Sequence, residues 1–396
     1  MRSCAFLLLP PALLLGLGCR RKAAAPAPPA EATLKLVAVG DFIPHQDVQR
    51  AALQAGGWAP LWEDLTPLLR EADLGFVNLE TPVAPGSGRP GVPFVFNAPA
   101  ELPGALKATG FTVLSCANNH AYDQGRRGLG ETLARLEQSG LVPLGAGPAP
   151  EAAMAPRILE RKGFRVAFLA FTDLLNGLPA RRQGDPLVAR LGADALGAVA
   201  SARSTAHAVV VSVHWGNEYQ LQPSRRQRDC AARLVAAGAD LVLGHHPHVL
   251  QPVEEVEAGG RKGIVAFSLG NFLSNQDRFW CADRAPVPEG DNRDGVALVA
   301  TFRACPRSGG KGSLRLEDVV LEPLWTENNA LERQTGRTAR TVVRVLRLNA
   351  ALQKAQEALP ASRERLRAFL LRRERIRQVT GARFIPDDAV AASLSR

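Results

Sequence analysis

The sequence predicts an α/β fold in which strands and helices alternate along the chain and stack in layers. Two observations support this prediction. Between residues 34 and 244, short apolar runs rich in β-branched residues alternate with helix-like stretches. Beyond residue 249, alternating or apolar runs are separated by glycine-rich turns, which predicts a second sheet. The 396 residues are 46% hydrophobic and 22% charged, as is usual for a soluble globular chain.

The elements are expected in the following order along the chain. The first region predicts strands at 34–41, 74–78, 111–116, 165–171, 208–214 and 240–244. Helices are predicted between them at 62–71, 128–139, 193–203 and 225–237. The second sheet is expected from 249–256, 262–269, 295–302 and 314–321. From about Asn328 the pattern is helical, with helices predicted at 337–359 and 362–379 on either side of Pro360.

The first residues predict export. Met1 and Arg2 form a positive start, and residues 5–17 are apolar but too short to span a bilayer. Cys19 follows Leu15-Gly16-Leu17-Gly18, which resembles a bacterial lipobox with Gly16 in place of the usual large aliphatic residue. We therefore expect a signal peptide and lipobox over residues 1–19, with Cys19 lipidated, and a flexible linker rich in Ala and Pro over 20–33.

The protein is thus expected to be an exported lipoprotein, anchored to a membrane through its N-terminal lipid and facing the periplasm or the cell exterior. A simple secreted protein and a retained anchor helix are the alternatives. Four later cysteines lie at 116, 230, 281 and 305 and show no CxxC spacing. Cys116 and Cys230 are expected to be buried, and Cys281 with Cys305 is the one pair worth testing as a disulfide.

Positive charge is concentrated at the C-terminal end. Residues 331–396 contain fifteen Lys/Arg and six Asp/Glu, so they hold most of the formal net charge of +10. Because an exported protein rarely meets nucleic acid, we expect no nucleic-acid partner. Amphipathic helices that pack on the domain or contact anionic lipid or polymer are expected, with a solvated helical face as the alternative.

Side chains able to bind metal follow five of the predicted strands. In chain order they are Asp41 with His45, then Asn78 and Glu80, then Asn118, Asn119 and His120, then His214, and finally His245, His246 and His248. Ligands of open α/β sheets bind outside the carboxyl ends of strands, so these side chains are expected to meet at one edge. Carboxylates suit hard cations and imidazole suits zinc, iron or manganese, which favours a carboxylate-bridged metal pair that activates water, with His120 left to protonate a leaving group.

Each residue also has a purely structural interpretation. Asp41 could be only a helix N-cap, and Asn118 and Asn119 could be turn residues. His214 could be a satisfied buried histidine, and His45 could lie past the edge in a helix. Because Pro247 restricts the residue before it, His246 is expected to be extended. The joint occurrence of these residues favours the metal site.

The ordered motifs resemble the CapA family of poly-γ-glutamate capsule biosynthesis proteins, whose fold is similar to that of the calcineurin-like metallophosphoesterases. The motifs are Gly40-Asp41, Asn78-Leu79-Glu80-Thr81-Pro82, Ala117-Asn118-Asn119-His120 with Asp123-Gln124-Gly125, His214-Trp215-Gly216-Asn217-Glu218-Tyr219, Gly244-His245-His246-Pro247-His248 and Ser268-Leu269-Gly270-Asn271-Phe272. The resemblance implies a four-layer αββα sandwich of two mixed sheets over residues 34–326, followed by a basic helical extension over 327–396.

The resemblance also implies two divalent metal ions, manganese, iron or zinc. It implies that Asp41 and His248 bind one ion, that Asn119, His214 and His246 bind the other, and that Glu80 bridges them. His120 matches the leaving-group acid. Further candidate site residues from the motifs and strand ends are His45, Asn78, Asn118, Asp123, Glu218, His245 and Asn271. The chain departs from the wider phosphoesterase pattern because Asp-x-His is absent at the first strand, the bridging Asp is Glu80, and the acidic residue after Asn-His is offset to Asp123.

What the resemblance implies about function is a role in the biosynthesis or export of poly-γ-glutamate or another anionic surface polymer, through a dinuclear site of the hydrolase type. A metal-dependent phosphoesterase with an unrelated phosphorylated substrate is one alternative. A non-catalytic scaffold of a polymer synthase complex is another. The implied partners are an anionic polymer or phosphorylated substrate and a polymer synthase or export complex, and a basic tail suits a polyanion.

Overall fold

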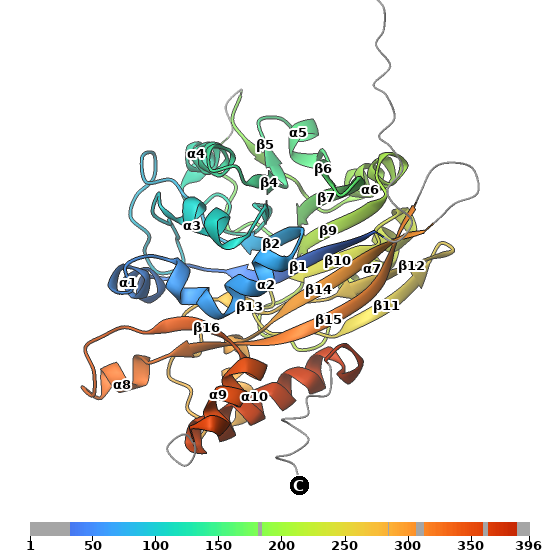
Figure 1. Ribbon diagram of the computed structural model, residues 1–396. Coiled ribbons are helices and arrows are strands. Elements are labelled where there is room, and N and C mark those ends of the chain that lie inside the picture. The colour runs from blue at the N-terminus through green and yellow to red at the C-terminus, as the bar shows by residue number, and fades with distance from the viewer. Residues whose placement is uncertain (1–31, 181–183, 284, 306–312, 359–362, 386–396) are drawn as a thin grey trace, which may run out of the picture.

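The computed structural model describes residues 32–180, 184–283, 285–305, 313–358 and 363–385 (Figure 1). The expected signal peptide, the lipobox with Cys19, and the linker up to residue 31 lie outside these residues. The strands are β1 (Thr33–Phe42), β2 (Leu74–Leu79), β3 (Val113–Ser115), β4 (Val142–Leu144), β5 (Ala146–Gly147), β6 (Arg157–Arg161), β7 (Phe164–Thr172), β8 (Leu187–Val188), β9 (Ala208–His214), β10 (Leu241–His245), β11 (Val253–Ala258), β12 (Arg261–Ala266), β13 (Asn271–Leu273), β14 (Asp294–Cys305), β15 (Ser313–Asn328) and β16 (Val343–Arg347).

The α-helices are α1 (Gln46–Gln54), α2 (Thr66–Glu71), α3 (Leu102–Thr109), α4 (Gly125–Gln138), α5 (Pro150–Met154), α6 (Ala193–Thr205), α7 (Arg225–Ala237), α8 (Ala330–Gln334), α9 (Leu348–Glu357) and α10 (Arg363–Thr380). Three short 3₁₀ helices are η1 (Ala59–Leu65), η2 (Val287–Arg293) and η3 (Ala382–Phe384). Among the described residues, no helix combines the length and the apolar character that a membrane span requires.

Two mixed sheets form the centre of the molecule. One has eight strands in the order β16-β15-β14-β1-β2-β3-β4, with β13 also paired to β1, and the other has six in the order β11-β12-β10-β9-β7-β6. Strand β9 shows how they are layered. Its residues Val209, Val211 and Val213 pack in a core with α6 and α7, whereas Ala208 and Val210 pack in the core shared with the eight-stranded sheet. Since successive side chains of a strand point to opposite faces, this alternation places one sheet against the other and helices outside.

Helices cover the outer face of the eight-stranded sheet as well, so the predicted αββα sandwich is confirmed. The segment η1, α2 and α3 contributes Trp62, Leu69 and Leu106 to the core, all buried. The indole of Trp62 donates to Thr109 Oγ1 at 3.0 Å, which joins η1 to α3. Figure 1 shows α9 and α10 lying along β14, β15 and β16 on the same sheet.

The sequence predicted that the strands after residue 249 form a second sheet of their own. This prediction is wrong, because these strands are divided between the two sheets. Strands β11 and β12 extend the sheet of β10, whereas β14 pairs antiparallel with β1 and β15 pairs with β14. The chain passes from one sheet to the other near Gly270, and there the backbones touch. A Cβ on Gly40 would lie 1.9 Å from the carbonyl oxygen of Gly270, so only glycine permits this approach directly before Asp41.

The C-terminal extension is not purely helical. The helix predicted at 337–359 is wrong for residues 337–347. Residues 337–342 are not helical, and Val343–Arg347 form β16 at the edge of the eight-stranded sheet. The alternation of buried Val343 and Val345 with exposed Arg344 is a strand pattern, and pairing with β15 decides in its favour. Helices α9 and α10 follow as expected, and buried side chains of both, such as Leu352, Phe369 and Ile376, belong to the main core.

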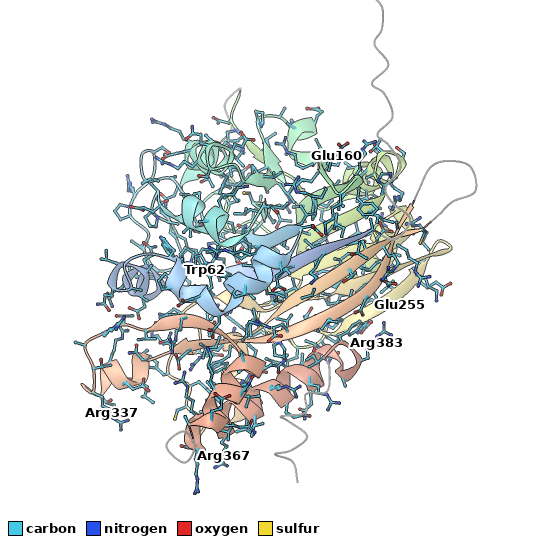
Figure 2. The ribbon with its side chains drawn as sticks, viewed as in Figure 1. Trp62, Glu160, Glu255, Arg337, Arg367 and Arg383 are labelled. Atoms are coloured by element: carbon cyan, nitrogen blue, oxygen red, sulfur yellow. The ribbon has the colours of Figure 1, made fainter. Side chains whose placement is uncertain are left out.

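The positive charge of this extension is divided between the surface and the domain. Figure 2 shows Arg367 of α10 and Arg383 of η3 on the outside of the molecule, and both are at least partly exposed. Arg365 instead pairs with Glu327 at 2.6 Å, and Arg372 is fully buried against Asp294. Some of the arginines of the extension therefore bind acidic residues of the domain, while others remain on the surface.

All four described cysteines are free thiols. Cys116 is buried as expected, and Cys230 is only half-buried. Cys281 and Cys305, the one pair that the sequence analysis singled out as a possible disulfide, do not form one.

Candidate metal centre

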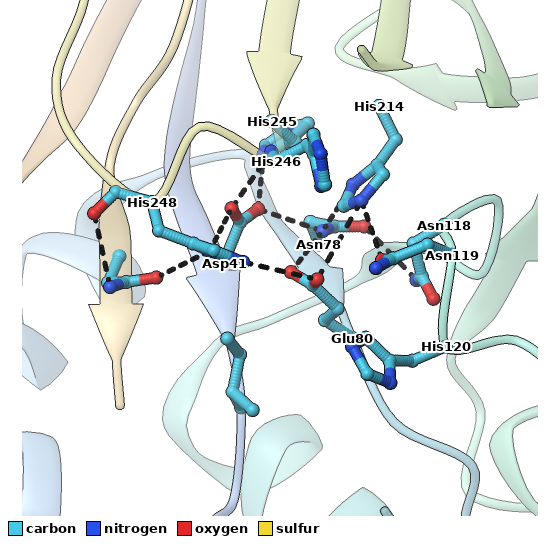
Figure 3. Close-up of polar contacts among 12 residues, drawn as sticks. Asp41, Asn78, Glu80, Asn118, Asn119, His120, His214, His245, His246 and His248 are labelled. Atoms are coloured by element: carbon cyan, nitrogen blue, oxygen red, sulfur yellow. Dashed lines mark hydrogen bonds and ion pairs between the residues drawn. The ribbon is translucent and has the colours of Figure 1, made fainter. Parts of the chain in front are cut away.

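The polar ends of β1, β2, β3, β9 and β10 meet between the two sheets. The first three strands belong to the eight-stranded sheet and the last two to the six-stranded sheet, so the side chains come from two sheets rather than from one edge. Figure 3 shows His248 on one side of Asp41, with His214 and Asn119 on the other. Asp41, Glu80 and His214 are fully buried at this junction, and His248 is nearly so.

Asp41 is held by groups from both sheets. Asn78 Nδ2 donates to its Oδ1 at 2.8 Å, and the backbone N–H of His246 donates to its Oδ2 at 3.0 Å. His245 Nδ1 lies 3.1 Å from the same Oδ1. Burial acts to raise the pKa of Asp41, but its hydrogen bonds to His245 and His248 and their charges keep that pKa well below its usual value. Asp41 is therefore a fixed carboxylate anion, not an N-cap.

The backbone around Pro247 is bent, not extended. His246 has φ of 96° and His248 has φ of 58°, so the expectation of an extended His246 is wrong. Positive φ is costly for residues other than glycine and persists only where other contacts enforce it. Here the N–H of His246 is held by Asp41, and the carbonyl of Pro247 accepts from the N–H of Tyr219 at 2.8 Å. This bend turns both imidazoles toward Glu80.

Glu80 is the residue shared by two groups of potential ligand atoms. One group is Glu80, His246 and His248, and the other is Asp41, Glu80 and His214, with the atoms of each group within 4.8 Å of one another. Glu80 Oε1 and His246 Nδ1 are buried without a hydrogen-bond partner. Buried polar atoms without partners are rare in native proteins, and two of them facing one space are what a cation would satisfy.

The electrostatics favour the same interpretation. Burial raises the pKa of Glu80 well above its usual value, and the neighbouring charge of Asp41 adds to this effect. Burial lowers the pKa of His214 well below its usual value, and burial with the charge of His248 lowers the pKa of His246 to about 4. Neutral imidazoles keep a lone pair for a metal, and a divalent cation would compensate the two adjacent carboxylates. The residues present therefore fit a site for divalent metal.

His214 and Asn119 are in direct contact on one side of this space. Asn119 Oδ1 lies 2.9 Å from His214 Nε2, and the ring centroids of His214 and His246 are 4.8 Å apart. The three residues that the resemblance assigns to one ion are thus neighbours. On the other side, His248 Nδ1 lies 3.2 Å from Asp41 Oδ2, so the pair assigned to the other ion is also adjacent.

A second set of residues supports the candidate ligands rather than reaching the shared space. Asn271 Oδ1 lies 3.1 Å from His248 Nδ1, which leaves Nε2 of that ring facing Glu80 at 3.7 Å. Histidines that bind metal commonly donate their other N–H to such a partner. Asn118 Nδ2 donates to the carbonyl of Leu79 at 2.8 Å and so fixes the end of β2 directly before Glu80.

His120 stands beside the candidate ligands with a carboxylate behind it. Its Nδ1 lies 2.8 Å from Asp123 Oδ2, and the same oxygen accepts from the N–H of Phe96 at 2.6 Å. The ring of Phe96 packs on His120 with a centroid separation of 4.5 Å. With Nδ1 turned to Asp123, Nε2 is the nitrogen left for proton transfer.

Two candidates lie at the rim. His45 is half-buried, its Nδ1 accepts from the N–H of Asn275 at 3.2 Å, and its ring packs on Phe96. Glu218 is exposed beside Tyr219, whose ring lies 6.4 Å from that of His248. Neither belongs to the two ligand groups found among the described residues.

Sequence reasoning missed Asn176. Its Oδ1 accepts from Asn119 Nδ2 at 3.1 Å, and its Nδ2 lies 3.4 Å from His120 Nε2. The signal was available, because Asn176 follows the predicted strand at 165–171 just as the other polar residues follow theirs. It was overlooked because three residues separate it from the end of that strand, β7, at Thr172.

A cleft of about 1020 Å³ opens next to the centre at His45. One wall carries Phe94 and Phe96, and the other is residues 275–280. Arg278 lies in this cleft over the ring of Phe279 and makes no ion pair with any described residue. Arg333 also lines the cleft, and it forms an ion pair with Asp47 at 2.8 Å. The volume of the cleft is at the upper end of the range usual for ligand-binding sites.

The chain is similar to known bacterial proteins over most of its length. Residues 35–276 match the family described as bacterial capsule synthesis protein PGA_cap. The chain is 31% identical over 310 residues to the PGA biosynthesis protein CapA of Bacillus subtilis (strain 168), covering 76% of this chain and 80% of the relative. It is 31% identical over 275 residues to the capsule biosynthesis protein CapA of Bacillus anthracis, covering 67% of this chain and 66% of the relative. A crystal structure of a hypothetical protein from Thermus thermophilus aligns with a TM-score of 0.41 at 17% identity, covering 73% of this chain and 98% of that one.

Proposed function

The chain belongs to the bacterial capsule synthesis protein family, and from this we propose that it acts in the synthesis or export of an anionic surface polymer of the poly-γ-glutamate type through a dinuclear metal site. The observation that carries the proposal is that Glu80 Oε1 and His246 Nδ1 are buried without hydrogen-bond partners. Asp41, His214 and His248 face the same space. A hydrolase-type role follows from the donor set. Two carboxylates, three imidazoles and the Asn119 oxygen make a mixed ligand set of the kind that two-metal hydrolases use.

Metal ions bound there would supply an activated water and polarise a substrate oxygen. The chain's own residues would do the rest. Asp41 keeps a negative charge in the site, and Glu80 would be ionised when a cation is bound. Asn78 and the His246 N–H fix the orientation of Asp41. Asp123 orients His120, whose Nε2 can give a proton to a leaving group.

We propose that the cleft beside His45 receives the polymer. Its Arg278 would pair with one of the repeated carboxylates, and the exposed rings of Phe94 and Phe279 would cover the apolar part of the chain. The opposing charges in this cleft are Asp277 and Glu289, while Asp47 is paired with Arg333. The protein would meet its substrate outside the cytoplasm, since residues 1–19 predict a lipidated export signal that ends at Cys19.

The experiment that tests the proposal combines metal analysis with turnover. The purified full chain is analysed for bound transition metal and then assayed on γ-linked glutamate oligomers and on an aryl phosphate. We expect metal in the wild type and loss of turnover in His120→Ala. His207→Asn is the control, because His207 is a half-buried histidine that accepts from the Arg165 N–H and does not belong to either ligand group.

The outcomes separate the alternatives. Turnover of the aryl phosphate alone, lost in His120→Ala, would favour a phosphoesterase with another substrate. The His120–Asp123 pair is the observation that supports this alternative function, because it could protonate the leaving group of a phosphate ester as well. Normal polymer output in cells that carry a metal-free Asp41→Ala variant would instead indicate a scaffold. Absence of bound metal in the wild type would refute the dinuclear site.

A further inference from the structure

The C-terminal helix α10 reaches the loop behind the candidate metal centre with two arginines. Arg372 is fully buried, and its Nε donates to Asp294 Oδ1 at 2.9 Å. Its Nη2 donates to Asp294 and to Asp291 Oδ1, and its Nη1 donates to the carbonyl of Val287. Arg375, one turn further along the helix, donates through Nη2 to Asp291 Oδ2 at 2.6 Å. Arg372 thus holds both ends of the segment 287–294, and both guanidinium groups hold Asp291 within it.

Between the two clamped aspartates lies Asn292, which contacts the centre directly. Its carbonyl accepts from Asn271 Nδ2 at 2.8 Å, and its own Nδ2 lies 3.3 Å from the carbonyl oxygen of His248. Asn271 in turn lies 3.1 Å from His248 Nδ1. Arg375 is therefore connected to His248 through Asp291, Asn292 and Asn271, each step being a hydrogen bond or a peptide link.

His248 needs such support because its backbone is strained. Its φ of 58° is unfavourable for a residue with a side chain, and release of the contacts at its carbonyl would let it relax. A relaxed His248 would no longer aim Nε2 at Glu80. The cleft wall depends on the same clamp, since Arg372 also lies over the ring of Trp280 at 5.1 Å.

We propose that the arginines of α10 are positioning residues for the metal centre, holding His248 through the segment 287–294. The inference rests on the proposed metal site and goes beyond it, because it assigns the C-terminal extension a function within that site. Residues 363–380 are thus required for metal affinity and not only for stability. Arg375 is the residue to test, since its side chain is 19% exposed, whereas that of Arg372 is fully buried and its loss would leave the buried carboxylate of Asp294 without its ion-pair partner.

The test compares Arg375→Ala with Arg365→Ala. Both variants remove one ion pair between α10 and the domain, but Arg365 pairs with Glu327 and not with the segment 287–294. Metal-free full-length protein is titrated with Co²⁺, whose visible absorption reports ligand geometry. We expect Arg375→Ala to bind Co²⁺ up to about tenfold more weakly and with altered bands. Loss of a direct partner of a metal ligand costs about tenfold or more, and Arg375 acts on His248 through Asp291, Asn292 and Asn271. Arg365→Ala should match the wild type, and Arg375→Lys should recover part of the affinity.

A second readout does not need metal. The imidazole NMR signals of His248, assigned with His248→Asn, should shift in Arg375→Ala and not in Arg365→Ala. The shift should be smaller in an Asn292→Ala background, because that change removes the hydrogen bond from Asn292 Nδ2 to the His248 carbonyl but keeps the Asn292 carbonyl that accepts from Asn271. Unchanged His248 signals in Arg375→Ala, together with a lower unfolding temperature, would overturn the proposal and leave α10 a purely structural role. Shifted His248 signals in a protein that binds no Co²⁺ would support the clamp while refuting the metal site.

Discussion

Glu80 is a buried carboxylate whose position is unfavourable without a cation. It is fully buried, its Oε1 has no hydrogen-bond partner among the described residues, and burial with the nearby charge of Asp41 raises its pKa. Two adjacent buried carboxylates without compensation destabilise a fold, and a divalent ion between them removes that cost. A residue in this position is typical of a binding site rather than of a core selected for stability.

Replacement of Glu80 by glutamine should therefore have opposite effects with and without metal. We expect metal-free Glu80→Gln to unfold at a temperature equal to or a few degrees above that of metal-free wild type, because glutamine keeps the shape of the side chain and cannot carry the charge that burial disfavours. With excess Mn²⁺ or Zn²⁺ the wild type should gain stability and the variant should gain little. Thermal unfolding with and without chelator measures both effects. An equal metal-induced gain in the two proteins would contradict the bridging role.

The charges of the cleft give a prediction about the sign of the ligand. Arg278→Ala should weaken binding of γ-linked glutamate oligomers, whereas Glu289→Gln should strengthen it, because the two side chains line the same cleft with opposite charge. Each change should be several-fold and should shrink at high salt. Calorimetric titration of the metal-loaded protein measures it. A reversed pair of effects would show that the cleft takes a cationic or neutral ligand.

At the scale of elements, helix α4 fixes the loop that borders the cleft. Glu131 of α4 accepts the backbone N–H groups of Gly86 and Ser87 at 3.0 and 2.7 Å and also pairs with Arg135. Burial acts to raise the pKa of Glu131, but hydrogen bonds from Ser87, Arg135 and Gly86 lower it from 4.5 to about 2. Its folded pKa lies below its unfolded pKa, so its ionised form stabilises the folded chain above pH 4.5, and that stabilisation is lost as the pH falls toward 2.

Glu131→Gln should consequently destabilise the protein at pH 7 and have a progressively smaller effect below pH 4.5. Thermal unfolding of both proteins between pH 7 and pH 3 measures the difference. Glu151→Gln on α5 is a suitable control, since Glu151 is exposed and makes no ion pair among the described residues. A difference that stays constant over this pH range would show that the charge of Glu131 is not what holds the loop.

At the scale of the whole molecule, the C-terminal extension is part of the domain and not an appendage. Strand β16 completes the eight-stranded sheet, and α9 and α10 bury Leu348, Leu352, Phe369 and Ile376 in the main core. Without them, β15 would become an exposed edge strand and an apolar face would open to water.

A chain that ends at residue 328 should therefore be insoluble, or should unfold at a much lower temperature than the full chain. Expression of both forms, followed by size-exclusion chromatography and thermal unfolding, checks this. The truncated chain should also lose metal affinity if it folds, because Asp291 and Asp294 lose Arg372 and Arg375. A soluble truncated chain with full stability and full metal content would contradict the prediction.

The sequence alone determined the α/β class and most of the elements near the site. Strand β9 was predicted at its observed bounds, and β1, β2, β7 and β10 within one residue at each end. It also determined which strands end in potential ligands, from Asp41 to His248. These features are local. Alternation of polar and apolar residues indicates which side of a strand is buried, and a polar residue after an apolar run indicates where the strand ends.

Only the tertiary structure decided how these elements combine. It divided the strands after residue 249 between two sheets, made Val343–Arg347 a strand, and gave His246 and His248 positive φ. It also brought Asn176 and the arginines of α10 to the centre. The physical reason is that pairing partners and backbone strain depend on contacts between residues far apart in the chain, such as Asp41 with the His246 N–H. No local pattern of polar and apolar residues specifies such contacts.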